Sequence, residues 1–205
     1  MKIGVIDYGA SNIFSVVRAL NSLGAKISVV KKPEDFNGID KLVFPGQGSM
    51  GSCMSRLNEA EMTIPMKEFI EEKPFLGICL GLQVLFSGSQ ESTEEKGLGV
   101  FSEEIKKFNS PKDTKLKIPH MGWNQIDFSQ DHFLWNGLES GENYYFVHSY
   151  ISCELKEEFI YSKTEHGQTF NSAISKDNIF ATQFHPEKSG KLGLKFLENF
   201  LNWRP

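Results

Sequence analysis

The chain has 205 residues, of which 40% are hydrophobic, and its formal net charge at pH 7 is −4. This length suits one compact domain with a sizeable core, and the absence of a lysine- or arginine-rich block argues against a nucleic-acid-binding surface. The three scattered cysteines, Cys53, Cys79 and Cys153, indicate neither a disulfide framework nor a zinc site, so we expect reduced thiols.

The first half of the chain alternates strand-like and helix-like segments. The pattern predicts strands at residues 2–6, 26–30, 41–44 and 75–78, and helices at residues 12–23, 62–72 and 82–86. In the first helix, apolar residues recur at helical spacing from Ile13 to Leu20, and Gly24 ends it. Strands that alternate with helices predict an α/β fold, in which helices cover both faces of a mostly parallel open sheet.

Beyond Gly99 the pattern changes to short alternating runs. Residues 144–148 and 179–184 predict further strands with hairpins, and residues 191–203 predict a last helix. We therefore expect additional antiparallel strands in the C-terminal half. The polar stretch at residues 87–96 is expected to be a surface loop and not a linker, so one domain is expected over residues 1–205.

The apolar segments predict neither a signal peptide nor a membrane span. The N-terminal apolar stretch is too short for a signal peptide and meets Asp7 at once. The longest apolar run, residues 75–86, is interrupted by Gln83 and is too short to cross a bilayer. We expect a soluble protein of the cytoplasm.

Cys79 is the most informative residue, because it lies at the centre of Gly-Ile-Cys-Leu-Gly, residues 77–81. An apolar strand precedes this run and helix-forming residues follow it. That arrangement is the cysteine version of the nucleophile elbow, a sharp strand-to-helix turn that exposes its central side chain. A helix N-terminus favours the thiolate form of such a cysteine. A buried structural cysteine is the alternative interpretation.

A nucleophilic cysteine needs a base, and His185 is the best candidate among five histidines. It follows a strand-like run and opens His-Pro-Glu, residues 185–187. In an extended segment, His185 and Glu187 would share one face, where the carboxylate would orient the imidazole. His132 and His166 lie among polar residues and are expected to be solvated. His148 could equally be a core histidine and is not expected to be catalytic. A solvated charge cluster at a strand end is the alternative for His-Pro-Glu alone.

Pro-Gly-Gln-Gly at residues 45–48 follows a predicted strand, as an oxyanion-binding turn should. Glycines there allow backbone N–H groups to point at a developing negative charge, although Pro-Gly also marks plain surface turns. Gln83 lies one helical turn after Cys79, so it is expected on the same face as the nucleophile.

Together, the Cys79 elbow and His185-Pro-Glu187 resemble the triad of class I glutamine amidotransferases. Four further segments resemble one branch of that family, the glutaminase subunits of imidazole glycerol phosphate synthase. They are Asp-Tyr-Gly at residues 7–9 with Asn12 and Ser15, Phe-Pro-Gly-Gln-Gly at 44–48, Pro-His-Met-Gly-Trp-Asn at 119–124 and His-Pro-Glu-Lys-Ser at 185–189. The resemblance covers essentially the whole chain and implies a flavodoxin-like sheet.

The resemblance also implies roles for individual residues. The triad would be Cys79, His185 and Glu187. The remaining site residues would bind glutamine or its oxyanion, and they are Gly46, Gln47, Gly48, Leu80, Gln83, Ser149 and Tyr150. Trp123 and Lys188 would face a partner protein. Gln47 departs from the family, where a small apolar residue is expected, so this turn could switch differently.

The implied chemistry is hydrolysis of glutamine to glutamate and ammonia through a cysteinyl thioester, without a metal or cofactor. Ammonia released into water becomes ammonium and is no longer nucleophilic, so a synthase must receive it directly. The resemblance implies that this partner is a (β/α)8-barrel cyclase, which forms a heterodimer with the glutaminase. The cyclase makes imidazole glycerol phosphate in histidine biosynthesis.

Three other interpretations remain open from the sequence. A paralogous glutaminase could feed a sugar-amidating synthase for cell-surface polysaccharide. A hydrolase or chaperone of similar fold also carries a cysteine elbow, but it has no reason to combine it with His-Pro-Glu and Gln83. A non-catalytic scaffold would not need intact Cys79, His185 and Glu187.

Overall fold

A computed structural model of the protein describes residues 1–9, 13–92, 94–108 and 117–205. Asn12, at the start of the first predicted helix, lies outside the described residues. Among the described residues, no helix combines the length and apolar character needed to cross a membrane.

One large sheet organises the fold. Its strands are β1 (Lys2–Ile6), β2 (Lys26–Val30), β3 (Lys41–Gly46), β4 (Phe75–Cys79), β8 (Asp127–Phe128), β11 (Ile160–Glu165), β12 (Thr169–Lys176) and β13 (Ile179–Thr182). Within the described residues their order is β2-β1-β3-β4-β13-β12-β11-β8. The first five in this order are parallel and the last three pair antiparallel, so both parts of the fold prediction are confirmed.

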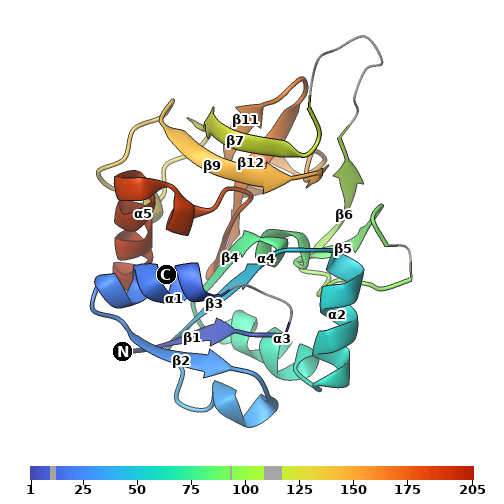
Figure 1. Ribbon diagram of the computed structural model, residues 1–205, viewed down its shortest axis with the longest axis vertical. Coiled ribbons are helices and arrows are strands. Elements are labelled where there is room, and N and C mark those ends of the chain that lie inside the picture. The colour runs from blue at the N-terminus through green and yellow to red at the C-terminus, as the bar shows by residue number, and fades with distance from the viewer. Residues whose placement is uncertain (10–12, 93, 109–116) are drawn as a thin grey trace.

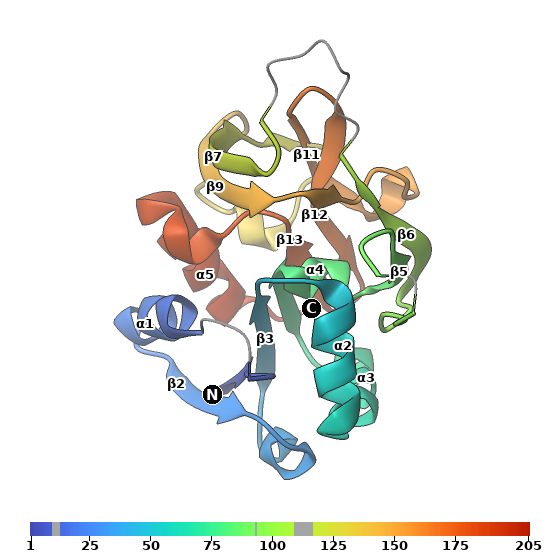
Figure 2. The ribbon, with the colours of Figure 1, turned by 45° about the vertical axis from the view of Figure 1, so that its right-hand side comes forward.

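Helices cover both faces of the parallel part of the sheet (Figures 1 and 2). On one face lie α1 (Phe14–Ser22) and α5 (Gly190–Asn202), and on the other lie α2 (Met50–Glu59), α3 (Thr63–Glu72) and the short α4 (Leu80–Gln83). The strands alternate between these layers. In β3, for example, Leu42 and Phe44 pack in the cluster with α2 and α3, whereas Val43 packs with α1 and α5.

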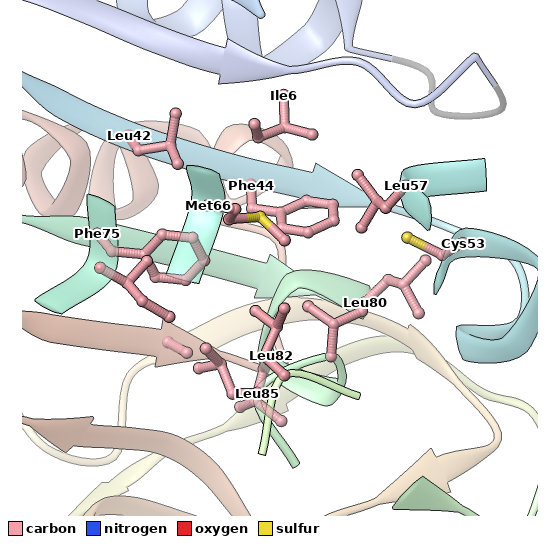
Figure 3. Close-up of a cluster of buried hydrophobic side chains, with 14 of the residues drawn as sticks. Ile6, Leu42, Phe44, Cys53, Leu57, Met66, Phe75, Leu80, Leu82 and Leu85 are labelled. Carbon is pink, nitrogen blue, oxygen red and sulfur yellow. The ribbon is translucent and has the colours of Figure 1, made fainter. Parts of the chain in front are cut away.

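Figure 3 shows part of the core on the side of α2 and α3. Phe44 lies among side chains from α2, α3 and α4, including Leu57, Met66 and Leu80. All four side chains are buried. Because burial of one such side chain contributes about 1.5–3 kcal/mol, this core fixes β3 and β4, whose C-terminal ends carry the candidate site.

Two smaller sheets lie beside the carboxyl ends of the parallel strands (Figure 1). One contains β5 (Phe86–Ser89), β6 (Phe101–Lys107) and β10 (Tyr150–Ile151), and the other pairs β7 (His120–Gln125) with β9 (Asn143–His148). Four 3-10 turns complete the described elements, namely η1 (Pro33–Phe36), η2 (Phe133–Trp135), η3 (Glu157–Phe159) and η4 (Pro186–Lys188).

The segment after the elbow differs from its prediction. A helix was predicted to continue to residue 86, but α4 ends at Gln83 and Phe86 begins strand β5. The reason is tertiary pairing: the N–H of Leu98 donates to the carbonyl of Val84 (2.7 Å), and the N–H of Phe101 donates to that of Leu85 (3.1 Å). The predicted loop at residues 87–96 was therefore wrong at its first residues, because strand β5 extends to Ser89.

Helix α2 was not predicted from the sequence. Gly48, Ser49 and Gly51 gave its start the composition of a loop, yet Ser49 caps the helix by accepting a hydrogen bond from the N–H of Ser52 (3.3 Å). Buried Met50, Cys53, Met54 and Leu57 follow helical spacing, which is the signal that would have predicted it.

Candidate active site

The candidate nucleophile lies where β4 meets α4. Cys79 has φ +54° and ψ −99°, an unusual conformation for a residue other than glycine and one found at strained functional turns. The turn needs both flanking glycines: a Cβ on Gly77 would lie 2.4 Å from the carbonyl oxygen of Gly81, and one on Gly81 would lie 1.9 Å from that of Phe44. Residues 77–81 therefore have the predicted elbow geometry.

The candidate base and its orienting carboxylate are in contact. His185 Nδ1 lies 2.8 Å from Glu187 Oε1, and their side chains are only 6% and 5% exposed. The predicted extended backbone between His185 and Glu187 was wrong, because residues 186–188 form the 3-10 turn η4. In this turn the N–H of Lys188 donates to the carbonyl of His185 (3.0 Å). Proline at the first position of such a turn is favourable.

The fold brings these groups together because they follow neighbouring parallel strands. Gly46 pairs with Cys79 at the ends of β3 and β4, while Thr182 pairs with Ile78 where β13 ends. His185 follows three residues later. Ligands of open α/β sheets bind at the carboxyl ends of the strands, and the predicted oxyanion turn, the cysteine and the histidine all lie at this edge.

Electrostatics favour the protonated form of His185. Burial lowers its pKa, but the charge of Cys79 and the proximity of its sulfur, followed by the hydrogen bond and charge of Glu187, outweigh burial and raise the pKa to about 10. The Nε2 atom of His185 makes no hydrogen bond of normal geometry with the described residues. At neutral pH this ring can therefore present a proton from Nε2.

Gln183, which was not among the predicted site residues, also contacts the sulfur. It is fully buried, and its Nε2 donates to Cys79 Sγ at 3.6 Å. Its position, two residues before His185 in the same segment, was the available signal. Ser189 is a second missed residue: its hydroxyl donates to the carbonyl of His185 (2.7 Å) and accepts from the N–H of Tyr145 (3.0 Å).

A cavity of about 330 Å³ adjoins Cys79. It brings together most of the residues expected to bind glutamine, with Gly46 lying outside it: the predicted residues in its lining are Gln47, Gly48, Leu80, Gln83, Ser149 and Tyr150. Gln83 Nε2 donates to the carbonyl of Tyr150 (3.3 Å), which joins two sides of the cavity. A slightly larger hollow near Ile70 and Leu98 shares no lining residue with this cavity.

Glu91 also lines this cavity and was not predicted, because it lies in the stretch expected to be a plain surface loop. Its Oε2 accepts a hydrogen bond from the N–H of Met50 (3.2 Å). Burial raises the pKa of its carboxyl group, and the bond from Met50 opposes this shift. A carboxylate at this position can pair with a substrate ammonium.

Buried histidines support the floor of the cavity. The carbonyl of Tyr150 can only accept, so His148 Nδ1 donates to it (3.0 Å), and its Nε2 accepts from His120 Nδ1 (3.1 Å). Asn124 Nδ2 then donates to His120 Nε2 (3.2 Å). Burial lowers the pKa of His148 to about 3 and that of His120 to about 4. Both rings are therefore neutral, as this series of hydrogen bonds requires.

Neither histidine expected to be solvated is a simple surface residue. His132 Nδ1 accepts from the N–H of Leu134 (3.1 Å), and its ring packs against Phe180 and Trp203. His166 stacks on His120 with ring centroids 4.0 Å apart. Polar neighbours in sequence do not report such tertiary packing.

The two residues expected to face a partner lie near each other. Trp123 is 57% exposed and lies on strand β7. Its ring lies 6.2 Å from that of Tyr145, and Lys188 Nζ lies 5.7 Å from the centre of the same ring. Tyr145 therefore connects Trp123 to the residue that follows the candidate triad.

Comparisons with known proteins agree with this geometry. A family model described as glutamine amidotransferase class-I matches residues 4–203. The chain is 44% identical over 202 residues to the imidazole glycerol phosphate synthase subunit HisH of Hydrogenovibrio crunogenus, covering 97% of this chain and 95% of that protein. It is 46% identical over 199 residues to the imidazole glycerol phosphate synthase subunit HisH of Methanocaldococcus jannaschii, covering 97% of this chain and 98% of that protein.

Two solved structures show the same fold at low identity. One is described as a glutamine amidotransferase (TM-score 0.73, 20% identity), and covers 97% of this chain and 98% of its own. The other is PurLQS from Thermotoga maritima (TM-score 0.76, 18% identity), and the match covers 98% of this chain and 97% of that chain. From the family model and the full-length relatives, we conclude that the chain is a class-I glutamine amidotransferase and belongs with the imidazole glycerol phosphate synthase subunits HisH.

Proposed function

We propose that this chain is the glutaminase of an imidazole glycerol phosphate synthase and serves histidine biosynthesis. The observation that carries the proposal is the buried His185–Glu187 pair beside a cysteine held at a strained strand-to-helix turn. The full-length similarity to HisH subunits supports the pathway. We expect it to act in the cytoplasm.

The proposed reaction begins with attack of the Cys79 sulfur on the side-chain amide carbon of glutamine. The carbonyl oxygen becomes an oxyanion, which backbone N–H groups of residues 46–48 and Leu80 would stabilise. The His185 imidazolium donates its Nε2 proton to the departing nitrogen, so ammonia leaves and a γ-glutamyl thioester remains. Neutral His185 then takes a proton from water, and the water oxygen attacks the thioester carbon. The carbon–sulfur bond breaks, so glutamate leaves and the Cys79 thiolate remains beside protonated His185.

The cavity offers groups for both ends of the substrate. Gln83, Ser149 and Tyr150 would hold glutamine in line with the sulfur, and the Glu91 carboxylate would pair with its α-ammonium group. Binding the amino-acid end far from the amide positions the reacting carbon, which is where much of the rate gain of such a site originates.

A second, much smaller opening supports transfer of ammonia to a partner. It has a volume of about 20 Å³, which suits one small molecule, and Pro45, Gly46 and Gln47 of the oxyanion turn line it. Its lining includes His185, Glu187 and Lys188. Since Lys188 and Trp123 both lie against Tyr145, we place the (β/α)8-barrel cyclase of a heterodimer on this side.

We further expect the partner to control the glutaminase. A glutaminase that works alone wastes glutamine, so the oxyanion turn of the free chain should favour an unproductive arrangement. The cyclase and its ligand must then bind the productive arrangement more tightly.

Reconstitution tests the proposal. Glutamate release by the free chain should be slow, and it should rise by at least about tenfold when the cyclase and its nucleotide substrate are added, with one imidazole glycerol phosphate formed per glutamate. Equal rates with and without the cyclase would contradict control by the partner. Glutamate formed without imidazole glycerol phosphate would contradict the proposed pathway.

A further inference from the structure

Asp-Tyr-Gly at residues 7–9 follows β1, and neither the triad nor the cavity lining beside Cys79 includes it. Tyr8 is buried, and its ring packs against Phe44 with centroids 5.9 Å apart. Its hydroxyl reaches the oxyanion turn, where it lies 3.0 Å from the position that a Cβ on Gly46 would take.

The hydroxyl of Tyr8 makes two hydrogen bonds to the backbone of one residue. It donates to the carbonyl oxygen of Gln47 at 2.9 Å and accepts from the N–H of Gln47 at 3.3 Å. A phenol can do both at once, because it has one O–H donor and free lone pairs. The two peptide groups that flank Gln47 are therefore held by a single side chain.

This contact removes a donor from the reaction. An N–H group stabilises an oxyanion only when it points to the place where the charge develops, and loss of one such donor typically lowers kcat by about 10²–10³. In the structure, the N–H of Gln47 points to Tyr8 instead. The glycines on either side, Gly46 and Gly48, would allow the peptide to turn toward Cys79.

We propose that Tyr8 is a positioning residue that holds the Gln47 N–H in an unproductive orientation, so that activation requires this contact to break. The inference rests on the proposed glutaminase function and adds the residue that keeps the free chain inactive. Burial raises the pKa of the Tyr8 hydroxyl, so its O–H stays available as a donor at neutral and alkaline pH.

Tyr8→Phe tests the inference, because it keeps the buried ring and removes only the hydroxyl. In the free chain, kcat for glutamine should rise about tenfold. The unproductive orientation loses the stabilisation of about one hydrogen bond, which corresponds to about a tenfold change in its population. KM should change less than twofold. In the complex with the cyclase and its ligand, the rate should equal that of the unaltered protein. The ratio of the rate in the complex to the rate of the free chain should therefore fall. A mere loss of packing would lower the rate in both forms.

Tyr144→Phe is the matched control. Tyr144 is fully buried, and among the described residues its hydroxyl has no hydrogen-bond partner. This variant also removes one buried phenol oxygen, but it should leave kcat of the free chain unchanged. A rise in both variants would mean that general loosening, and not the Tyr8 contact, controls the rate, and would overturn the inference.

Amide hydrogen exchange provides a test in the unaltered protein. The Gln47 N–H should exchange more slowly than an unprotected amide in the free chain, and exchange at the unprotected rate would overturn the inference. An unchanged kcat in folded Tyr8→Phe, with Cys79-dependent hydrolysis intact in the complex, would also overturn it and leave the glutaminase function standing. Absence of Cys79-dependent hydrolysis in the unaltered complex would overturn the proposed function and the inference with it.

Discussion

His185 lies between a carboxylate and a sulfur, and both neighbours favour its charged form. Because the pKa is raised to about 10, the ring is protonated at neutral pH, as a proton donor to departing ammonia should be. Glu187 fixes the orientation of the ring through Nδ1 and leaves Nε2 for the reaction.

Substitutions in this pair should differ in severity. His185→Ala removes the proton donor itself and should lower kcat of the complex by about 10²–10⁴. Glu187→Gln removes the charge but keeps an oxygen near Nδ1, so the loss should be smaller. Rates of glutamate release by both variants check the order. A loss in Glu187→Gln equal to or greater than that in His185→Ala would contradict an orienting role for Glu187.

Lys41 shows how a charged side chain can stabilise the core at a distance from the site. It is 2% exposed, and its Nζ donates to the last carbonyls of α5, those of Phe200 (2.7 Å) and Leu201 (2.9 Å), and to that of Trp203. The N–H of Trp203 also donates to the carbonyl of Phe200 (3.2 Å), and Arg204 Nη1 donates to those of Leu201 (3.1 Å) and Trp203 (2.9 Å). A cation at a helix C-terminus is favourable.

Lys41→Met should lower the free energy of unfolding by about 2 kcal/mol, because it removes the hydrogen bonds that a buried cation makes to the carbonyls at the end of α5. Urea unfolding of the free chain measures the change. Lys26→Met, on the exposed side of β2, is the control and should change it by less than about 0.5 kcal/mol. Equal effects in the two variants would mean that the contacts of Lys41 contribute nothing.

At the scale of elements, the pair β7–β9 connects the expected partner surface to the triad. Trp123 and Tyr145 face each other in the register of this pair. The backbone of Tyr145 accepts from the N–H of His185 (2.9 Å) and donates to the hydroxyl of Ser189 (3.0 Å). A partner seated on Trp123 would therefore contact a strand that itself holds the candidate base.

Trp123→Ala should weaken the complex with the cyclase by about 2 kcal/mol, which is roughly thirtyfold in Kd. Since Trp123 is exposed, the melting temperature of the free chain should change little. Trp203→Ala is the contrasting variant, because Trp203 lies in the core and its loss should destabilise the free chain. Titration calorimetry and thermal melts distinguish these outcomes. If Trp123→Ala lowered the melting temperature of the free chain as much as Trp203→Ala does and left the affinity for the cyclase unchanged, Trp123 would stabilise the fold and not the complex.

At the scale of the whole molecule, neutral histidines that are buried (His120 and His148) or half-buried (His132) make stability depend on pH. Burial lowers the pKa of His120 and His132 to about 4 and that of His148 to about 3. The unfolded chain binds protons at these sites below about pH 6.5, whereas the folded chain does not. Their stabilising contribution is thus complete above pH 6.5 and is lost as the pH falls toward 4.

We expect the free energy of unfolding to fall steeply between pH 6.5 and 4, with a slope of at most about 1.4 kcal/mol per pH unit for each such histidine. His132→Asn should reduce the slope, since asparagine can still accept from the N–H of Leu134 but does not titrate there. Urea unfolding at several pH values checks this. A slope that His132→Asn leaves unchanged would contradict the role of His132.

The sequence predicted the parallel strands and the elbow well, because their signals are local. Apolar runs mark the strands, and the glycines around Cys79 mark a turn that only small residues permit. The residues that it missed act through contacts between distant segments. Gln183 reaches Cys79 across 104 positions, and Tyr8 reaches Gln47 across 39. No periodicity records such pairs.

The same reason explains the errors in local structure. His185 and Glu187 meet as predicted, but through a 3-10 turn that begins at Pro186. Phe86 lies in a strand because β6, a segment further along the chain, pairs with it. In both places tertiary contacts decided a conformation that local preference left open.

Labelling with a glutamine-like diazo ketone tests the central claim, that Cys79 is the nucleophile of a glutaminase. Peptide mapping of the labelled complex should place one adduct on Cys79, with glutamate release lost in proportion. Burial raises the pKa of Cys53 and of Cys153, so both should stay unmodified. An adduct on either of them, or undiminished glutamine hydrolysis by Cys79→Ala, would contradict the account.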